Sequence, residues 1–173
     1  QKEVELGRDY AAATTPDQLK AFAAAHPGHV LAGIARLRLA DDDYAAGRST
    51  EAIYGYEDAA AALKSSPLAS RARLGLAMAK IQGGKNADGE DALKQLMSDP
   101  SEAKAIRVEA AYQLASLANA AGKPDDVKKY SEQVMQIDAT SPWLQRTLML
   151  RATSMAPAST PAPAAPAITF PVT

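Results

Sequence analysis

The sequence lacks cysteine altogether, which excludes a disulfide-bonded scaffold and a zinc site built from thiolates. No apolar run comes near the roughly 20 residues that a membrane-spanning helix needs. The formal net charge is −1 at pH 7, so no basic surplus exists to pair with phosphates, and we expect no nucleic-acid partner. Aromatic residues make up only 5% of the chain and long β-branched runs are missing, which argues against a buried β-sheet.

Alanine is what the chain has in abundance. Hydrophobic residues account for 47% of the sequence, and alanine supplies much of this fraction. It combines the highest helix propensity with the smallest apolar side chain. With 173 residues, the chain is long enough for one domain with a core. We therefore predict an all-α fold in which the helices approach one another closely.

Four positions before a proline predict helix starts. A side-chain oxygen there accepts from free backbone N–H groups, and proline suits the first helical position. The four residues are Thr15, Ser66, Asp99 and Ser141. Gln18 and Glu102 follow two of them by three positions, as a capping box requires. The segment 122–127, GKPDDV, predicts a fifth start, because its aspartates lie at the positive end of the helix dipole.

Glycines predict where helices end, because glycine adopts the left-handed conformation that terminates a helix. The glycine turns between the predicted starts are at Gly47, Gly83-Gly84 and Gly122. The tripeptide HPG at 26–28 breaks the first clear helix, and Ser49 is the predicted cap of the helix after Gly47. The predicted helices span residues 2–13, 16–25, 29–46, 50–64, 67–82, 87–98, 101–121, 124–138 and 142–155.

A helix, a glycine turn and a second helix recur three times along the chain. The dipeptide Leu-Ala occurs at 39–40, 76–77 and 114–115, at separations of 37 and 38 residues, and a glycine turn follows each pair. Further matches fall 12, 16 and 19 positions after each alanine. Those matching positions hold Ala52, Gly89 and Val127, then Tyr56, Leu93 and Ser131, then Ala59, Leu96 and Val134. Such self-similarity indicates a repeat architecture.

These positions resemble the tetratricopeptide (TPR) repeat, over about residues 33–140. Arg36, Arg73 and Ala111 stand where that repeat usually has a tryptophan, and Gly89 and Ser131 also depart from it. The resemblance implies a right-handed α-α superhelix of about eight or nine helices, with three degenerate TPR-like helix pairs. The order of segments predicts an N-terminal helical lead-in at 1–28, a TPR-like domain at 29–155 and a Pro/Ala-rich tail at 156–173.

The wider layout is similar to that of the envelope TPR proteins with an N-terminal membrane anchor. The helical lead-in, the segment HPGHVLAGIARLRLA and the Pro/Ala tail carry this likeness. Its best-known type is the YfgM-like family, which is ancillary to the Sec translocon and to periplasmic chaperones. The likeness implies a place in the cell envelope or periplasm; the alternative is the cytoplasm. Because the chain begins at Gln1 rather than Met, we expect that upstream sequence has been removed, and that any membrane contact is made by an anchor there.

Two clusters contain residue types that can bind a metal ion. Asp41, Asp42 and Asp43 would fan across about 200° of one helix, so they cannot converge on one cation. We interpret them as a solvated helix face, with Asp41 alone as a polar contact of a groove. His26 and His29 flank a turn, but no third histidine and no cysteine completes a site. We interpret them as parts of a loop and a helix start.

Stacked helix pairs form a concave surface lined by their first helices. By the TPR resemblance, the residues on that surface are Ile34, Leu37, Asp41, Tyr44, Arg71, Leu74, Met78, Ile81, Glu109, Tyr112, Ser116 and Asn119. The aliphatic members also suit packing, so we predict the partner-binding residues to be Asp41, Tyr44, Arg71, Met78, Glu109, Tyr112, Ser116 and Asn119. The set holds no Lys/Arg clamp for a terminal carboxylate. It suits an extended or helical segment with apolar anchors.

The sequence favours a non-catalytic protein–protein interaction scaffold that assists translocation, folding or assembly of other proteins. The alternative is a cytoplasmic TPR adaptor or regulatory subunit. A small helical enzyme or metal-binding protein is disfavoured, because the chain shows neither a nucleophile elbow nor a phosphate-binding loop. We expect no catalytic residues, no metal and no cofactor. We also expect the tail segment AITFPVT to dock as an extended peptide, on its own chain or on a neighbour, which would give self-association.

Overall fold

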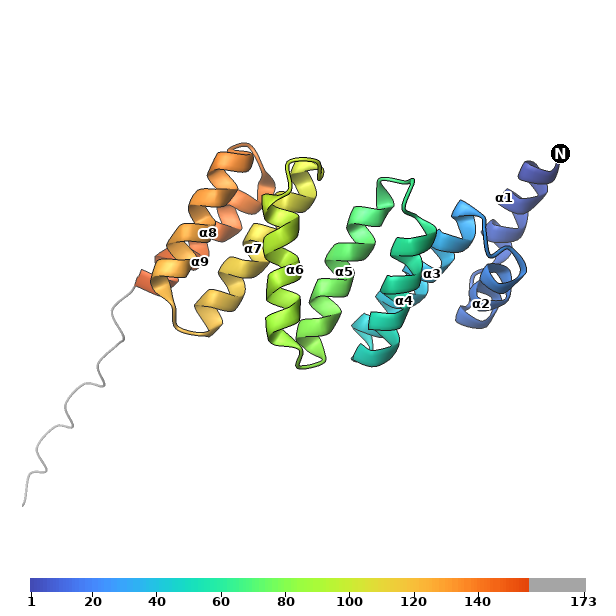
Figure 1. The fold of residues 1–173 in the computed structure, drawn as a ribbon, viewed down its shortest axis with the longest axis horizontal. Helices are drawn as coiled ribbons and strands as arrows, with labels where there is room; N and C mark the ends of the chain where they lie inside the picture. The colour runs from blue at the N-terminus through green and yellow to red at the C-terminus, as the bar shows by residue number, and fades with distance from the viewer. Residues whose placement is uncertain (156–173) are drawn as a thin grey trace, which may run out of the picture.

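The computed structural model describes residues 1–155, so the predictions about the tail lie outside the described residues. Over this range the chain forms nine α-helices and no strand (Figure 1). The helices are α1 (Lys2–Ala12), α2 (Pro16–Ala25), α3 (Val30–Ala45), α4 (Ser49–Ala62), α5 (Leu68–Gln82), α6 (Asn86–Ser98), α7 (Lys104–Ala120), α8 (Pro124–Ile137) and α9 (Pro142–Met155). The all-α prediction is therefore confirmed for residues 1–155. No helix within them has the length and hydropathy needed to cross a membrane.

The helices form an elongated array in which each packs on the next along the chain (Figure 1). In addition, α3 contacts α5, α5 contacts α7, and α7 contacts α9. Among the described helices, α4, α6 and α8 make no such contacts with one another. The odd-numbered helices from α3 onward therefore form one continuous layer, and α4, α6 and α8 stand along its other side.

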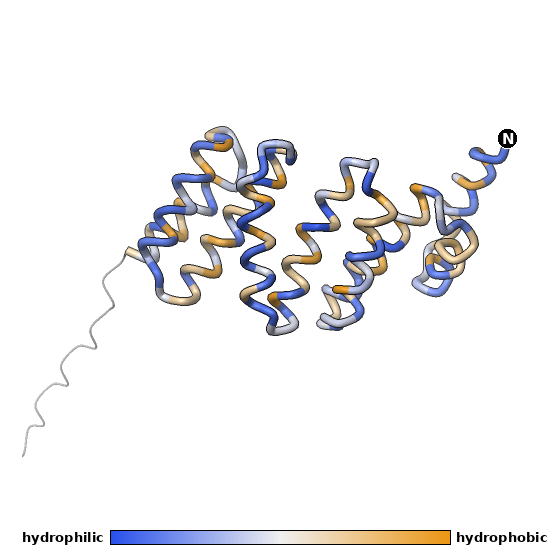
Figure 2. Tube along the Cα trace, viewed as in Figure 1, coloured by the Kyte–Doolittle hydropathy of each residue, from blue (hydrophilic) through white to orange (hydrophobic). Residues whose placement is uncertain are grey.

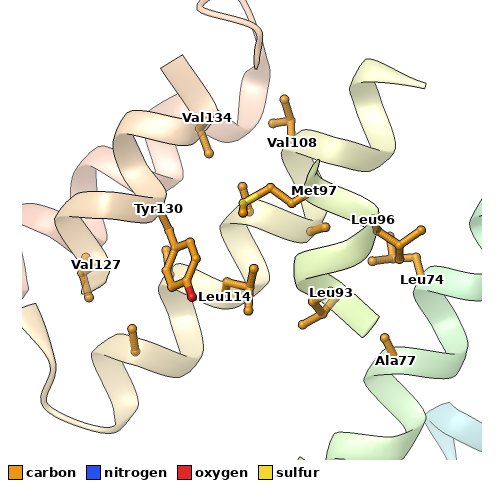
Figure 3. Close-up of a cluster of buried hydrophobic side chains, with 14 residues drawn as sticks. Leu74, Ala77, Leu93, Leu96, Met97, Val108, Leu114, Val127, Tyr130 and Val134 are labelled. Atoms are coloured by element: carbon orange, nitrogen blue, oxygen red, sulfur yellow. The ribbon is translucent and has the colours of Figure 1, made fainter. Parts of the chain in front are cut away.

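The core runs along the array and consists largely of small side chains. Figure 2 shows apolar and polar residues alternating along the helices, so each helix offers one side to its neighbours. Ala40 of α3 is fully buried, and a Cβ on Gly55 of α4 would lie only 2.9 Å from its methyl group. Larger side chains fill the C-terminal half, where Leu93, Leu114 and Tyr130 come from three successive helices (Figure 3). The prediction of closely approaching helices is confirmed.

Several helix boundaries follow their local signals. Thr15 and Gln18 form the predicted capping box: Thr15 Oγ1 accepts from the Gln18 backbone N–H at 3.2 Å, and Gln18 Oε1 accepts from the Thr15 N–H at 3.2 Å. Ser141 Oγ accepts from the Trp143 N–H at 3.2 Å, at the start of α9. The turns after α3, α5 and α7 contain Gly47, Gly84 and Gly122, whose φ angles are 76°, 83° and 67°. These glycines therefore hold the left-handed conformation that the sequence predicted.

The predicted start of α7 was wrong. The helix begins at Lys104, not at residue 101. The side chain of Asp99 accepts from the backbone N–H and the hydroxyl of Ser101, at 2.8 and 2.6 Å, which closes a turn instead of a cap. Glu102 makes no capping box, because its carboxylate accepts from the side chains of Ser70 and Arg73 on α5.

Two other predicted caps act differently. Ser49 is the first residue of α4 rather than its cap, and its hydroxyl donates to Gln82 Oε1 at 3.0 Å. It thus ties α4 to the end of α5. Ser66 accepts from the N–H of Leu68 at 3.2 Å, and α5 begins at Leu68, one residue later than predicted.

Candidate partner-binding groove

A half-open hollow of about 310 Å³ lies in the layer formed by α3, α5 and α7. Its lining residues are Asp41, Tyr44, Tyr56, Arg71, Leu74, Gly75, Met78, Glu109 and Gln113. The structure thus brings together Asp41, Tyr44, Arg71, Met78 and Glu109, which the sequence had named from three separate helices. We call this hollow the groove. Hydroxyl, carboxylate, guanidinium and thioether groups meet there within one small volume.

Tyr56 enters the groove from α4, behind the layer. Its hydroxyl donates to a carboxylate oxygen of Asp41 at 2.6 Å, although the residue is only 3% exposed. The ring lies against Gly75 of α5, where a Cβ would overlap it. Burial, followed by the hydrogen bond to Asp41, raises the pKa of the Tyr56 hydroxyl well above its usual range. The hydroxyl therefore stays protonated and fixes one oxygen of the carboxylate.

Arg71 and Glu109 cross the groove from α5 to α7. Arg71 Nη1 donates to both carboxylate oxygens of Glu109, at 3.1 and 3.2 Å. This ion pair leaves the carboxylate of Asp41 as the unbalanced charge among the lining residues. The groove is therefore acidic by one charge. Tyr44 and Met78 supply aromatic and thioether surface beside it.

Sequence reasoning placed Tyr56 in the core and missed its polar end. A buried tyrosine usually finds a hydrogen-bond partner for its hydroxyl. Asp41 was already predicted to face a groove. A hydrogen bond from the Tyr56 hydroxyl to Asp41 was therefore the feature that the sequence could have suggested. The 15 residues between them bridge a helix–turn–helix, which brings the two side chains together only after α3 and α4 pack.

Other predicted groove residues lie elsewhere. The prediction for Ile81 was wrong, because its side chain lies over Gly89 of α6, where an added Cβ would overlap it. Leu37 is buried in the core between α3, α4 and α5, and Ile34 packs on the same cluster. Leu74 is buried too, and only its edge lines the groove.

The far end of α7 does not join the groove. Tyr112 packs its ring against Trp143 of α9, with 4.8 Å between the ring centroids. The guanidinium carbon of Arg146 lies over the Trp143 ring, 4.8 Å from its centroid. Ser116 and Asn119 follow Tyr112 along α7 and are half-buried, outside the lining residues. The predicted surface therefore consists of two separate parts. One is the groove, and the other is the contact of Tyr112 with Trp143 of α9.

A second hollow, of about 490 Å³, lies between α5, α6 and the turn before α7. Sequence reasoning missed it. Its lining includes Glu102, whose side chain is only 7% exposed and is satisfied by Arg73 and Ser70. Lys80 and Asp99 also border it. The buried carboxylate of Glu102 links the turn before α7 to Ser70 and Arg73 of α5. We therefore assign these three residues a structural role.

The histidines serve local structure, as the sequence indicated. His29 Nδ1 accepts from the Leu31 N–H at 3.1 Å at the start of α3, and its Nε2 lies 3.2 Å from a carboxylate oxygen of Glu3. His26 packs against Phe22, with 4.9 Å between the ring centroids. Over residues 1–155 the structure gathers no group of three or more potential metal ligands.

No family model, curated protein or solved structure matches this chain. The groove, its charges and its shape are therefore the grounds on which function is proposed.

Proposed function

We propose that the chain is a non-catalytic interaction scaffold of the TPR-like type, which binds a peptide segment of another protein in the groove. The observation that carries this proposal is the convergence of Asp41, Arg71 and Glu109 on one hollow. They come from three alternate helices, α3, α5 and α7, and Arg71 and Glu109 are separated by 38 residues, close to the repeat length. A repeat that returns one side chain per unit to one face builds a binding surface.

The packing pattern supports the TPR-like pairing. Each of α3, α5 and α7 packs on the following helix, and these three also contact the next odd-numbered helix. Two-helix units stacked in this way bury a continuous core and leave the first helices on one face. We propose that the units wind as a right-handed superhelix, the form implied by the sequence repeat.

The groove chemistry defines the segment that fits. Tyr44 and Met78 suit an apolar anchor, since a thioether and an aromatic ring adapt to varied side chains. Asp41 keeps lone pairs beyond the one used by Tyr56 and suits a lysine or arginine next to that anchor. An extended or helical peptide with an apolar residue flanked by a basic one is therefore the proposed ligand.

The proposed cellular role is help in translocation, folding or assembly of other proteins in the cell envelope, with a cytoplasmic adaptor as the alternative. The order of lead-in, helix pairs and Pro/Ala tail supports the envelope. Fractionation of cells that express the native gene separates the two. Recovery with the membrane or periplasmic fraction supports the envelope role, and recovery in the cytosol contradicts it.

The binding test begins with a displayed library of random dodecapeptides selected on the purified chain. We expect enriched peptides to combine an apolar and a basic residue. Asp41→Lys should weaken their binding about tenfold or more, because a like charge then faces the basic residue. Fluorescence anisotropy measures the dissociation constants.

The matched control for this test is Asn119→Ala. Asn119 lies on α7 within the surface that the sequence predicted, but outside the groove. Binding by this variant should equal that of the parent chain. If Asp41→Lys and Asn119→Ala leave the affinity equally unchanged, the groove is not the binding face.

A further inference from the structure

Helix α5 borders a hollow on each of two opposite sides. Arg71 and Met78 turn toward the groove. Arg73, Leu76 and Lys80 line the other hollow, of about 490 Å³, between α5, α6 and the turn before α7. At about 100° per residue, this second row of side chains points roughly opposite to the first. We call this space the α5–α6 hollow. Because it is a separate surface, what it binds does not depend on the function proposed for the groove.

The middle of the α5–α6 hollow is apolar. Leu76 faces it from α5, and Ala92 and Leu96 face it from α6. Leu96 is buried, and the other two are half-buried. Sites for small molecules usually have volumes of about 300–1,000 Å³ and a mostly apolar lining with a few polar groups. The α5–α6 hollow has the size and the apolar floor of such a site.

Lys80 gives one end of the hollow a positive charge. The residue is half-buried, and it belongs to none of the ion pairs that the structure contains among residues 1–155. Arg73 and Lys80 are seven residues apart on the same side of α5, which separates them by about 10 Å along the helix axis. Lys80 therefore lies at the opposite end of the hollow from Arg73.

The end near Arg73 carries one negative charge. Arg73 and Glu102 form an ion pair there, and their charges cancel. Asp99 adds a carboxylate, and Ser101 donates to one of its oxygens from the hydroxyl and from the backbone N–H, at 2.6 and 2.8 Å. These two hydrogen bonds, and more weakly the Arg73 guanidinium, hold the pKa of Asp99 below its usual range. Asp99 is therefore ionised at neutral pH and can accept from a cation.

The two ends and the apolar middle define the ligand. A molecule that fits all three has an ammonium group and a carboxylate about 10 Å apart, with an apolar group between them. Three extended amino acids span about 10 Å. An internal segment of a protein lacks both terminal charges, so the matching ligand is a free peptide. We propose that the α5–α6 hollow binds a free tripeptide, with its amino terminus at Asp99, its central apolar side chain over Leu76 and its carboxylate at Lys80.

The probe for this proposal is alanyl-leucyl-alanine, compared with its N-acetylated and its C-amidated form. NMR titration of the isotope-labelled chain gives each dissociation constant and shows which residues shift. We expect saturable binding with a dissociation constant of about 1 mM, and shifts at Leu76, Ala92 and Leu96. Removal of either terminal charge should weaken binding about threefold to fivefold, because each charge then loses an exposed ionic partner.

Variants assign each end of the peptide. In Lys80→Gln, the amidated peptide should bind as well as the free acid, because the ionic partner of the carboxylate is gone. In Asp99→Asn, acetylation should likewise have no effect. The matched controls are Lys20→Gln on α2 and Asp58→Asn on α4, which remove the same charges at exposed positions outside the hollow. Both controls should keep the parent chain's response to blocked peptides.

The comparison of free and blocked peptides on the parent chain needs no variant, so it stands even if a substitution disturbs the fold. Equal affinities for all three peptides would overturn the proposal. So would an effect of amidation that persists in Lys80→Gln, or one of acetylation that persists in Asp99→Asn. Shifts at Met78 of the groove without shifts at Leu76 would overturn it as well, and so would the lack of saturation up to about 10 mM peptide.

Discussion

The phenolic oxygen of Tyr56 lies 2.6 Å from a carboxylate oxygen of Asp41, so a side chain of α4 reaches through the layer of α3 and α5 into the groove. The ring is packed and the hydroxyl is bonded, which joins core stability to the geometry of the proposed binding site. A change at either residue therefore affects both, and stability must be measured beside binding.

Tyr56→Phe keeps the ring and removes the hydroxyl, and we expect it to lower the free energy of unfolding by about 1 kcal/mol near neutral pH. The pKa of this hydroxyl is raised in the folded chain, whereas an unfolded tyrosine ionises near pH 10. As the pH rises above about 10, only the unfolded state releases the proton, so the parent chain loses stability. The variant should lose less over the same range.

Urea unfolding at about pH 8 and about pH 11 measures this difference. Burial also raises the pKa of Tyr130, and that contribution is common to both proteins, so it cancels in the comparison. Equal losses of stability in the parent chain and in Tyr56→Phe would show that Tyr56 titrates normally in the folded state.

Gly75→Ala should destabilise the fold by about 1–3 kcal/mol, because the added methyl group overlaps the Tyr56 ring between α4 and α5. The control is Gly7→Ala within α1, where an added Cβ meets nothing within 4 Å. That change should be neutral or stabilise the helix by up to about 1 kcal/mol. Thermal unfolding of both variants tests the contrast, and similar melting temperatures would refute the close approach of Tyr56 to Gly75.

Glu102→Gln should lower stability by about 1.5–3 kcal/mol, because the buried carboxylate loses its charge opposite Arg73. Hydrogen exchange should also speed up in the first turn of α7, which follows this tether directly. The exposed Glu51 on α4 provides the control, and Glu51→Gln should change stability by less than about 0.5 kcal/mol. Indistinguishable urea midpoints for the two variants would mean that Glu102 is no tether.

The local signals for helices were sufficient over most of the chain. The capping box of Thr15 and the glycine turns depend on neighbours within a few residues, so they are readable from sequence alone. The start of α7 was not readable. Glu102 could bond to the backbone beside it or to Arg73, 29 residues earlier, and packing of α5 and α6 decides between the two.

The groove was predictable in part for the same reason. The repeat placed Asp41, Arg71 and Glu109 on one face, because that inference needs only the spacing of equivalent positions. Ile81 obeyed the same spacing but lies against α6, since Gly89 opens a space there that a larger residue would close. Tyr112 of α7 contacts Trp143, which lies on α9 beyond the three predicted repeats. The repeat pattern therefore could not predict that Tyr112 lies outside the groove.

Nearly every packing contact in the array joins helices that follow one another or are one helix apart. Such a chain closes only short loops as it folds, and its stability divides into local units joined by nearest-neighbour terms. The outermost helices can therefore unravel while the middle persists. A ligand bound across α3, α5 and α7 would fasten three of these units to one another and make them melt together.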